Sequence, residues 1–287
     1  MTASTAQHAA SGGTGRRRLL DVAGLTKYFG DGDKRQLCLE GLSFRIAAGK
    51  LSMLMGPSGC GKTTLINLIA GYESPDSGSI TLGGAPVTGP GSDRLVVFQE
   101  STLFPWMTVY GNVVFGCNVQ GLSQSETRER TELILSKVGL YEFRDRYPSQ
   151  LSGGMQRRAE LARALINDPK LMIMDEPFRG LDAMTKELMQ EFYLKIFEET
   201  KLTTLFVTHE LEEAIFMADS LVLMTHRPGR VKEIIDVDLP RPRHFSMMAS
   251  KRYFDLYSYA IGLLTEEARR AFDADVTLAM DTTPNFA

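Results

Sequence analysis

A glycine-rich octapeptide lies between an apolar run at residues 51–55 and a helical pattern that ends near Gly71. It follows the G-x-x-x-x-G-K-[S/T] pattern of a phosphate-binding loop and reads Gly56-Pro57-Ser58-Gly59-Cys60-Gly61-Lys62-Thr63. Glycines allow a tight turn whose backbone N–H groups converge on phosphate oxygens, and the following helix N-terminus adds further donors. We therefore expect a nucleotide site in which Lys62 reaches the β- and γ-phosphates and the Thr63 hydroxyl ligates Mg²⁺, with Thr64 beside them.

A second apolar run, at residues 171–174, ends in the two carboxylates Asp175 and Glu176. Strands of open α/β folds place their carboxyl ends at the edge of the sheet where ligands bind. We therefore expect Asp175 to hold the Mg²⁺ shell and Glu176 to polarise the water that attacks the nucleotide.

Short apolar runs rich in β-branched residues alternate with longer helical patterns, which is typical of an α/β fold. Strands are expected at residues 19–25, 42–47, 51–55, 79–82, 95–98, 171–174, 203–207 and 221–224. Helices are expected after residue 61 and at residues 126–138, 155–166 and 183–198. Because few strands are expected between about residues 100 and 170, a helical subdomain is predicted to be inserted there.

Composition limits the kinds of partner that the chain can bind directly. A formal net charge of -3 provides no concentrated basic face, so no nucleic-acid partner is expected. No run approaches the ~18 consecutive apolar residues that a membrane-spanning helix needs. Cys38, Cys60 and Cys117 are odd in number and widely spaced, which indicates reduced thiols and not a disulfide framework or a metal site.

Both ends of the chain are predicted to lie outside the main domain at residues 19–240. Residues 1–18, rich in Ala, Ser, Thr and Gly, are expected to be a disordered leader without a signal peptide. The prolines at 240 and 242 break regular structure, and residues 241–287 are expected to form a C-terminal helical extension. An apolar stripe at helical spacing is expected to be buried against the domain, the alternative being a surface for a partner or a membrane. It comprises Tyr253, Tyr257, Ile261, Leu264, Ala268 and Phe272.

A third motif, Leu-Ser-Gly-Gly-Met-Gln-Arg-Arg at residues 151–158, opens a predicted helix. A small, donor-rich turn at a helix N-terminus is a second anion site. Together with the phosphate loop and the carboxylate pair, this motif resembles the signature of ATP-binding cassette (ABC) ATPases, over about residues 20–240. The resemblance implies that Ser152, Gly153 and Gly154 cap the γ-phosphate of ATP held by a second subunit, so that two nucleotides lie in a head-to-tail dimer.

Further residues occupy positions of the family's other motifs, and the resemblance implies their roles. Phe29 lies where the family stacks an aromatic ring on adenine, with Tyr28 as the alternative. Gln99 matches the Q-loop glutamine that contacts Mg²⁺ and the water, and His209 matches the switch histidine that contacts the γ-phosphate. Asp182 matches the aspartate of the D-loop.

The resemblance implies an active ATPase that uses ATP and Mg²⁺, with a P-loop core, the inserted helical subdomain and an antiparallel β subdomain. Segments at residues 90–106 and 227–243 are most similar to ATPases of nitrate, sulfonate and taurine importers. This implies an identical or paralogous second ATPase subunit, two transmembrane permease subunits that contact the surface near Gln99 and the helical subdomain, and, indirectly, a periplasmic solute-binding protein. Trp106, the sole tryptophan, lies in that stretch and is expected to pack in the core, with a docking anchor as the alternative. The resemblance also implies a peripheral location on the cytoplasmic face of the inner membrane, and it leaves the solute open.

The chain departs from the family pattern at Met155 and Arg157, where Gln is common, and at Arg179, where the usual sequence is Phe-Gly-Ala-Leu-Asp. Arg179 is expected to alter contacts between subunits. Two other functions compete with import, namely a soluble ABC ATPase acting in DNA repair or translation, and an exporter subunit. The chain carries a single cassette without long coiled coils and without a fused membrane domain, so import is favoured.

Overall fold

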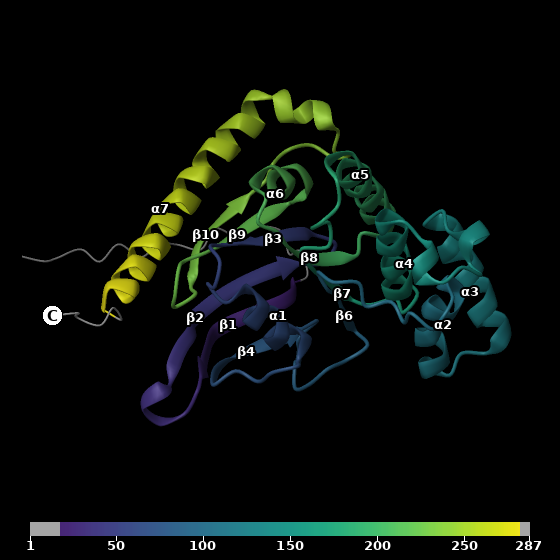
Figure 1. Ribbon diagram of the computed structural model, residues 1–287, viewed down its shortest axis with the longest axis horizontal. Helices are drawn as coiled ribbons and strands as arrows, with labels where there is room; N and C mark the ends of the chain where they lie inside the picture. The colour runs from purple at the N-terminus through teal and green to yellow at the C-terminus, as the bar shows by residue number, and fades with distance from the viewer. Residues whose placement is uncertain (1–17, 282–287) are drawn as a thin grey trace, which may run out of the picture.

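A six-stranded sheet forms the centre of the computed structural model, which describes residues 18–281 (Figure 1). In spatial order its strands are β10 (Val231–Asp236), β9 (Ser220–Met224), β3 (Leu51–Met55), β8 (Thr203–Val207), β7 (Leu171–Asp175) and β6 (Arg94–Val97). All neighbours are parallel except β10, which runs antiparallel to β9. Every residue of β3 and β8 is buried, as expected for parallel strands covered on both faces.

A second sheet is antiparallel and packs on one face of the first. In spatial order its strands are β2 (Gln36–Ala47), β1 (Arg18–Phe29), β4 (Ser77–Leu82) and β5 (Ala85–Pro86). The helix α1 (Lys62–Ala70) lies between the two sheets, and one buried cluster joins Leu20 and Phe44 of the second sheet to Leu65 of α1 and Leu54 of β3. The expected antiparallel β subdomain is therefore confirmed.

Three helices are inserted between β6 and β7 and form the right-hand end of the molecule in Figure 1. They are α2 (Val109–Gln120), α3 (Gln124–Lys137) and α4 (Gly153–Leu165). They enclose a core of their own that includes Val113, Leu135 and Ala159. At the start of α3, Ser123 and Glu126 form a capping box that satisfies free N–H groups of the first turn. The inserted helical subdomain and the α/β class are confirmed.

The other face of the central sheet is covered by α5 (Ala183–Thr200), α6 (Leu211–Met217) and α7 (Lys251–Asp281). Short 3-10 helices lie at Gly32–Lys34, Tyr141–Phe143, Pro148–Gln150 and Phe245–Ala249. The Phe216 ring of α6 stacks on Phe245 with the centroids 4.5 Å apart, and the Tyr253 hydroxyl of α7 donates to the Glu212 carbonyl oxygen at 3.3 Å. Within residues 18–281, no helix combines the length and apolarity that spanning a membrane requires.

The expected burial of the C-terminal stripe is wrong for about half of its members. Tyr253 is buried, but Ile261, Ala268 and Phe272 are exposed. The buried face of α7 runs instead through Leu256, Ala260 and Glu267, alongside Tyr253. A helix repeats every 3.6 residues, so residues spaced mostly by four turn gradually around its axis. Along so long a helix, the expected stripe therefore turns away from the narrow contact with the domain.

Several boundaries also differ from expectation. The helix of the extension begins at Lys251, because residues 245–249 form a separate 3-10 turn. Residues 1–17 of the expected leader lie outside the described residues, and Arg18 already belongs to β1. Two α-helices and two strands were not expected from the sequence, namely α2, α6, β5 and β10, and neither were the short 3-10 helices.

Replacing Leu256 of α7 by Ala is expected to destabilise the fold. Its side chain is 4% exposed in the core beneath α6, and truncating a buried Leu to Ala costs about 2–5 kcal/mol. Tyr259→Ala is the matched control, because Tyr259 lies on the same helix but is 52% exposed. Urea unfolding of both variants checks this, and equal midpoints for the two would contradict the packing of α7 on the domain.

Candidate functional site

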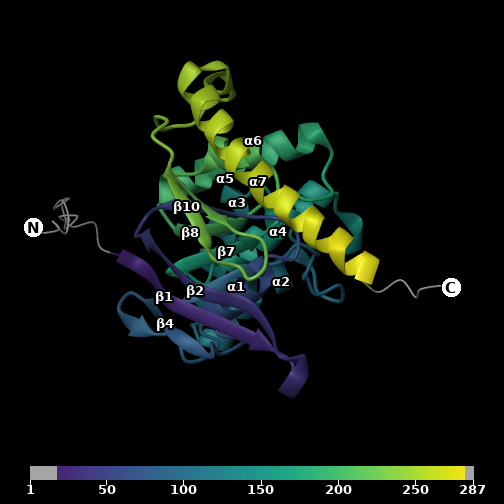
Figure 2. The ribbon, with the colours of Figure 1, turned by 90° about the vertical axis from the view of Figure 1, so that its left-hand side faces the viewer.

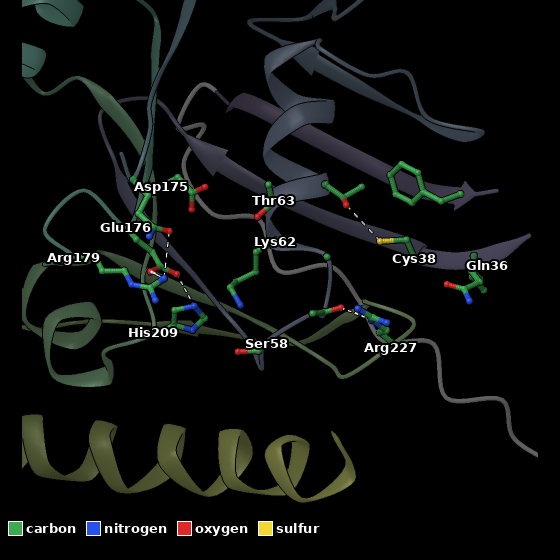
Figure 3. A pocket seen from close by; sticks show the side chains of 16 residues that line it. Gln36, Cys38, Ser58, Lys62, Thr63, Asp175, Glu176, Arg179, His209 and Arg227 are labelled. Atoms are coloured by element: carbon green, nitrogen blue, oxygen red, sulfur yellow. Dashed lines mark hydrogen bonds and ion pairs between the residues drawn. The ribbon is translucent and has the colours of Figure 1, made fainter. Parts of the chain in front are cut away.

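The carboxyl ends of β3, β6, β7 and β8 open at one edge of the central sheet, where they surround a cleft of about 500 Å³ (Figure 3). The cleft is lined by Phe29, Gln36, Leu37, Cys38, Ser58, Gly59, Gly61, Lys62, Thr63, Thr64, Gln99, Asp175, Glu176, Arg179, His209 and Arg227. Most residues that the sequence nominated thus lie together. Gly56, Pro57 and Cys60 belong to the same loop but do not line the cleft.

The phosphate loop curls around the ammonium group of Lys62. This side chain is only 8% exposed, and its Nζ donates to the carbonyl oxygens of Gly56 at 2.8 Å and Pro57 at 3.1 Å. Gly59 and Gly61 have φ of 74° and 100°, a region that favours glycine, and α1 begins directly after Gly61. The loop therefore turns its backbone and one cation toward the cleft at a helix N-terminus, which is a geometry suited to phosphate.

The carboxylate of Glu176 is held from two sides. Its Oε1 lies 2.5 Å from Nε2 of His209, and its Oε2 lies 3.2 Å from a guanidinium nitrogen of Arg179. Glu176 itself has φ of 44°, which is uncommon for a residue with a side chain, and its N–H donates to the Val207 carbonyl oxygen at 2.9 Å. The turn that follows β7 and leads to α5 thus presents this carboxylate to the cleft in a strained backbone conformation.

Burial and neighbouring charges shift the protonation of two groups in the cleft. The pKa of Asp175 is raised, first by burial and then by the charge of Glu176, while Lys62 opposes the shift. The pKa of His209 is lowered, first by burial and then by Lys62 and Arg179, against the opposing effect of Glu176. The His209 ring is therefore neutral at pH 7, and the short contact places its proton on Nε2, facing Glu176.

Replacing Arg179 by Gly, the residue that the family more commonly has there, is expected to raise the pKa of His209. The change removes a positive charge that disfavours the imidazolium and frees Glu176 to pair with the ring. The pKa can be measured by following the ring resonances of His209 in an NMR titration. Arg252→Gly on α7 is the control, since Arg252 is exposed and pairs with Asp238; an unchanged or lower pKa in Arg179→Gly would contradict the assigned contacts.

Two departures from the family pattern converge on Gln99. The guanidinium of Arg157, on α4, donates to the backbone oxygens of Gln99 and Phe98, and that of Arg179 lies 3.3 Å from the Gln99 side-chain oxygen. Arg157 also pairs with Glu160 at 2.7 Å. Arg157 of the helical subdomain therefore holds the backbone of Gln99, and Arg179 in the cleft contacts the Gln99 side chain. Gln99 thus links the helical subdomain to the cleft.

The signature residues and Asp182 lie outside the cleft of their own chain. Ser152 caps α4, its Oγ accepting from the Met155 N–H at 3.3 Å, and Gly153 and Gly154 form the first turn of that helix. Asp182 caps α5 by accepting from the Thr185 N–H at 3.0 Å. None of these residues lines the cleft.

The far end of the cleft combines an expected residue with unexpected ones. Phe29 lines it, 42% exposed, whereas the ring of Tyr28 is covered by the Arg35 guanidinium at 4.0 Å and does not line it. Arg227 was not nominated from the sequence, yet its Nε donates to the Gly59 carbonyl oxygen at 2.7 Å. It follows β9, a neighbour of β3, so the rule that ligands bind at strand carboxyl ends could have found it.

Gln36, Leu37 and Cys38 also line the cleft and carry no local signal. They come from β2 of the antiparallel sheet, and only the packing of the two sheets brings them to the phosphate loop. A Cβ on Gly61 would lie 2.7 Å from the Leu39 side chain, which shows how closely β2 approaches this loop.

The residues present fit ATP and Mg²⁺. The cleft offers a glycine loop with one enclosed cation for phosphates, an exposed aromatic ring for a base, and a hydroxyl, an amide and a carboxylate on one side for a hard cation. Hydroxyl, amide and carboxylate oxygens are ligands that Mg²⁺ accepts, and the raised pKa of Asp175 marks a carboxylate that a bound cation would stabilise in its charged form.

Comparison with known proteins agrees with this geometry. A family model described as "ABC transporter" matches residues 39–179. An uncharacterized ABC transporter ATP-binding protein of Methanocaldococcus jannaschii is 47% identical over 78% of this chain and 84% of its own length. Taurine import ATP-binding proteins of Chromobacterium violaceum and Yersinia pestis are 48% and 45% identical, over 68% and 77% of this chain and 75% and 85% of their own lengths.

Two solved structures resemble the fold, each at 27% sequence identity. One is a dimeric ATP-binding cassette in a post-hydrolysis state bound to ADP and phosphate, with a TM-score of 0.67 over 77% of this chain and 100% of that one. The other is CbiO1 of Clostridium perfringens, part of an ABC transporter complex, with a TM-score of 0.72 over 87% of this chain and 99% of that one.

Proposed function

Because the chain belongs to the ATP-binding proteins of ABC transporters, we propose that it hydrolyses ATP to power import of a small anionic solute of the nitrate, sulfonate or taurine type. The observation that carries the proposal is the similarity to taurine import proteins, combined with a cleft that fits ATP. In this proposal the chain works at the cytoplasmic face of the membrane, attached to a permease. A role in DNA repair or translation is not favoured by these relatives.

Within the cleft, we assign the phosphates to the loop at residues 56–63, with the Lys62 ammonium on the β- and γ-phosphates and adenine on Phe29. Thr63, Gln99 and Asp175 would hold Mg²⁺, which neutralises phosphate charge when it is bound. The charge on Lys62 is fixed in place by backbone oxygens, so it needs little rearrangement to stabilise the charge that develops during hydrolysis.

Glu176 is assigned as the group that accepts a proton from the attacking water. Its position at the end of β7 places the carboxylate beside the cation site, and His209 on one oxygen fixes its orientation. His209 is also expected to contact the γ-phosphate, because it lies in the same cleft as Lys62. Gln99 would help to orient the water, because its side-chain oxygen and the Glu176 carboxylate both lie beside Arg179.

The site is proposed to be completed by a second ATPase subunit. Ser152, Gly153 and Gly154 present the N-terminus of α4 to solvent, away from their own cleft, so they are free to cap the γ-phosphate bound by the partner. Asp182 would lie at the same interface, because the preceding residue, Leu181, lies next to Gly153. A Cβ built on Gly153 would be 3.4 Å from the Leu181 side chain. Closure of two such subunits couples the nucleotide state to a rigid-body motion.

A second hollow, of about 530 Å³, is the surface we assign to the permease subunits. It lies between the helical subdomain and the central sheet next to Gln99, and four aromatic side chains line it, namely Tyr72, Phe98, Phe104 and Phe115. Trp106, 69% exposed, stacks on Phe104 at its rim with the centroids 5.5 Å apart. Exposed aromatic rings around an apolar hollow suit an anchor from a partner protein.

The proposed function is tested in a strain that lacks the gene for this chain. Uptake of labelled taurine, an alkanesulfonate and nitrate is measured after complementation with the wild-type gene or with Glu176→Gln. We expect one of these solutes to enter with the wild type and not with Glu176→Gln, while Glu191→Gln, an exposed glutamate of α5, restores uptake. Equal uptake of all three solutes with and without the gene would overturn the assignment.

A further inference from the structure

The outer face of α7 carries an uncharged stripe that no other described element covers. Its six members are all exposed, at alternating spacings of four and three residues, and are Phe254, Ser258, Ile261, Thr265, Ala268 and Phe272. They occupy a band about 80° wide on the helix. In Figure 2, α7 runs diagonally across the front of the molecule. Phe254 and Phe272 are 66% and 69% exposed, and large apolar side chains held in water along one line mark an interaction surface.

Alternating four- and three-residue spacing is the pattern with which two helices pack along their length. The flank of the stripe identifies which helix fits. On one side it carries Lys251, Asp255, Arg269 and Asp273, with Gly262 midway along it. The opposite flank is apolar and leads to the buried face.

Only an antiparallel pair of identical helices brings the charged flanks of both together, in reversed order. Reversed about Gly262, Lys251 of one helix faces Asp273 of the other, and Asp255 faces Arg269, so that opposite charges meet at each position. A parallel pair would instead set the charged flank against the apolar one. Charges flanking such a contact choose the partner and its orientation.

We infer that α7 is an interaction surface that pairs antiparallel with α7 of a second copy of this chain, about a two-fold axis between Gly262 and Leu263. A Cβ placed on Gly262 would meet no heavy atom within 4 Å, so the glycine leaves open space where the two helices would cross. The contact is self-complementary and closed, as two-fold interfaces are. The large side chains Phe254 and Phe272 would meet at the ends of the stripe, and Ser258 would lie opposite Ala268 of the second copy.

The inner face of α7 ties this surface to the nucleotide cleft. Glu267 accepts from the His226 backbone N–H at 2.8 Å and pairs with Lys232 at 2.7 Å. The next residue, Arg227, lines the cleft and donates to Gly59. Figure 3 shows α7 crossing below the cleft. Pairing of the two helices would therefore hold the two clefts near each other, and it would raise the effective concentration of one subunit around the other. The inference goes beyond the proposed function, because the pairing needs no nucleotide.

Disulfide cross-linking tests the pairing and its direction. Full-length Ser258→Cys and Ala268→Cys chains are oxidised mildly without nucleotide, each alone and as an equal mixture, with the wild type as control for Cys38, Cys60 and Cys117. We expect the mixture to form a cross-linked dimer and neither variant alone to do so. No more cross-linking than in the wild type would overturn the proposal, as would equal cross-linking of each single variant, which indicates a parallel pair.

A charge placed on the stripe supplies an independent test. Ile261→Glu and the matched control Tyr259→Glu both alter exposed positions of α7, so neither is expected to change folding. In sedimentation equilibrium without nucleotide, Ile261→Glu should weaken self-association at least about tenfold and Tyr259→Glu should not. Equal association of Ile261→Glu and the wild type would overturn the pairing. An ATP-dependent dimer formed by Glu176→Gln is scored separately, so that failure of the proposed function is distinguished from failure of the α7 contact.

Discussion

Glu176→Gln is expected to reduce steady-state ATP hydrolysis by ~10²–10⁴-fold, the usual cost of removing a general base, while ATP binding is retained. The amide has the same size, but its single oxygen can accept from His209 or from Arg179 and not from both, as the two carboxylate oxygens do. The backbone bond from Glu176 to the Val207 carbonyl oxygen is unchanged, so the turn after β7 keeps its shape. The variant therefore loses proton acceptance and one of these two side-chain contacts. In the proposed mechanism, unhydrolysed ATP should also trap the closed dimer.

The measurement is a turnover assay together with nucleotide titration and light scattering. Glu191→Gln on α5 is the control, because that side chain is exposed and does not line the cleft. Turnover close to that of the wild type would exclude Glu176 as the essential base. Loss of ATP binding along with turnover would show instead that the carboxylate is needed to build the site.

The parts of the fold that could be predicted are those where one local rule acts alone. The strands β3 and β8 have the bounds expected from the sequence, because each is a fully buried apolar run flanked by polar or turn residues. The gathering of Gln99, Asp175 and His209 followed from a single further rule, that parallel strands share the edge at their carboxyl ends.

The helix α2 could not be predicted in this way, because it carries little helical pattern. It contains Gly111 and Gly116 and several valines, residues that disfavour helix on their own. Tertiary contacts hold it instead. Asn112 is fully buried, and its side chain accepts from the Phe104 N–H at 2.7 Å and donates to the carbonyl oxygens of Met107 and Thr108 at 3.2 Å and 3.0 Å. Such a network is visible only once the chain is folded.

The prediction also missed the strand β10 and the buried face of α7. In these two segments the sequence pattern pointed to a different structure. β10 buries only Ile235 and is otherwise partly or fully exposed, so it lacks the apolar run used to find the other strands. In α7, two apolar lines share one helix, and the sequence cannot say which of them faces the domain. The buried ion pair of Glu267 with Lys232 settles the choice in the structure.

The part of the cleft next to β2 shows that prediction of the site from the sequence is limited in the same way. Cys38 comes from a segment with no nucleotide-binding pattern, and it reaches the phosphate loop through contacts between the two sheets. A backbone bridge between Leu39 and Gly229 joins its segment to the one that follows β9. Side chains contributed by such long-range pairing require the fold before they can be named.

Lys62→Ala is expected to remove productive ATP binding. Each charge-assisted hydrogen bond to phosphate contributes about 1.5–3 kcal/mol, so losing contacts to two phosphates lowers affinity roughly a hundredfold or more. Lys62→Arg should not restore binding, because the 8% exposed ammonium fits between the Gly56 and Pro57 carbonyl oxygens, where a planar guanidinium is too large. Calorimetric titration with ATP checks both variants, with circular dichroism to establish folding and Lys170→Ala, an exposed lysine outside the cleft, as control. If folded Lys62→Ala bound and hydrolysed ATP like the wild type, the loop at residues 56–63 would not be a phosphate cradle, and the assignment of the cleft would fail with it.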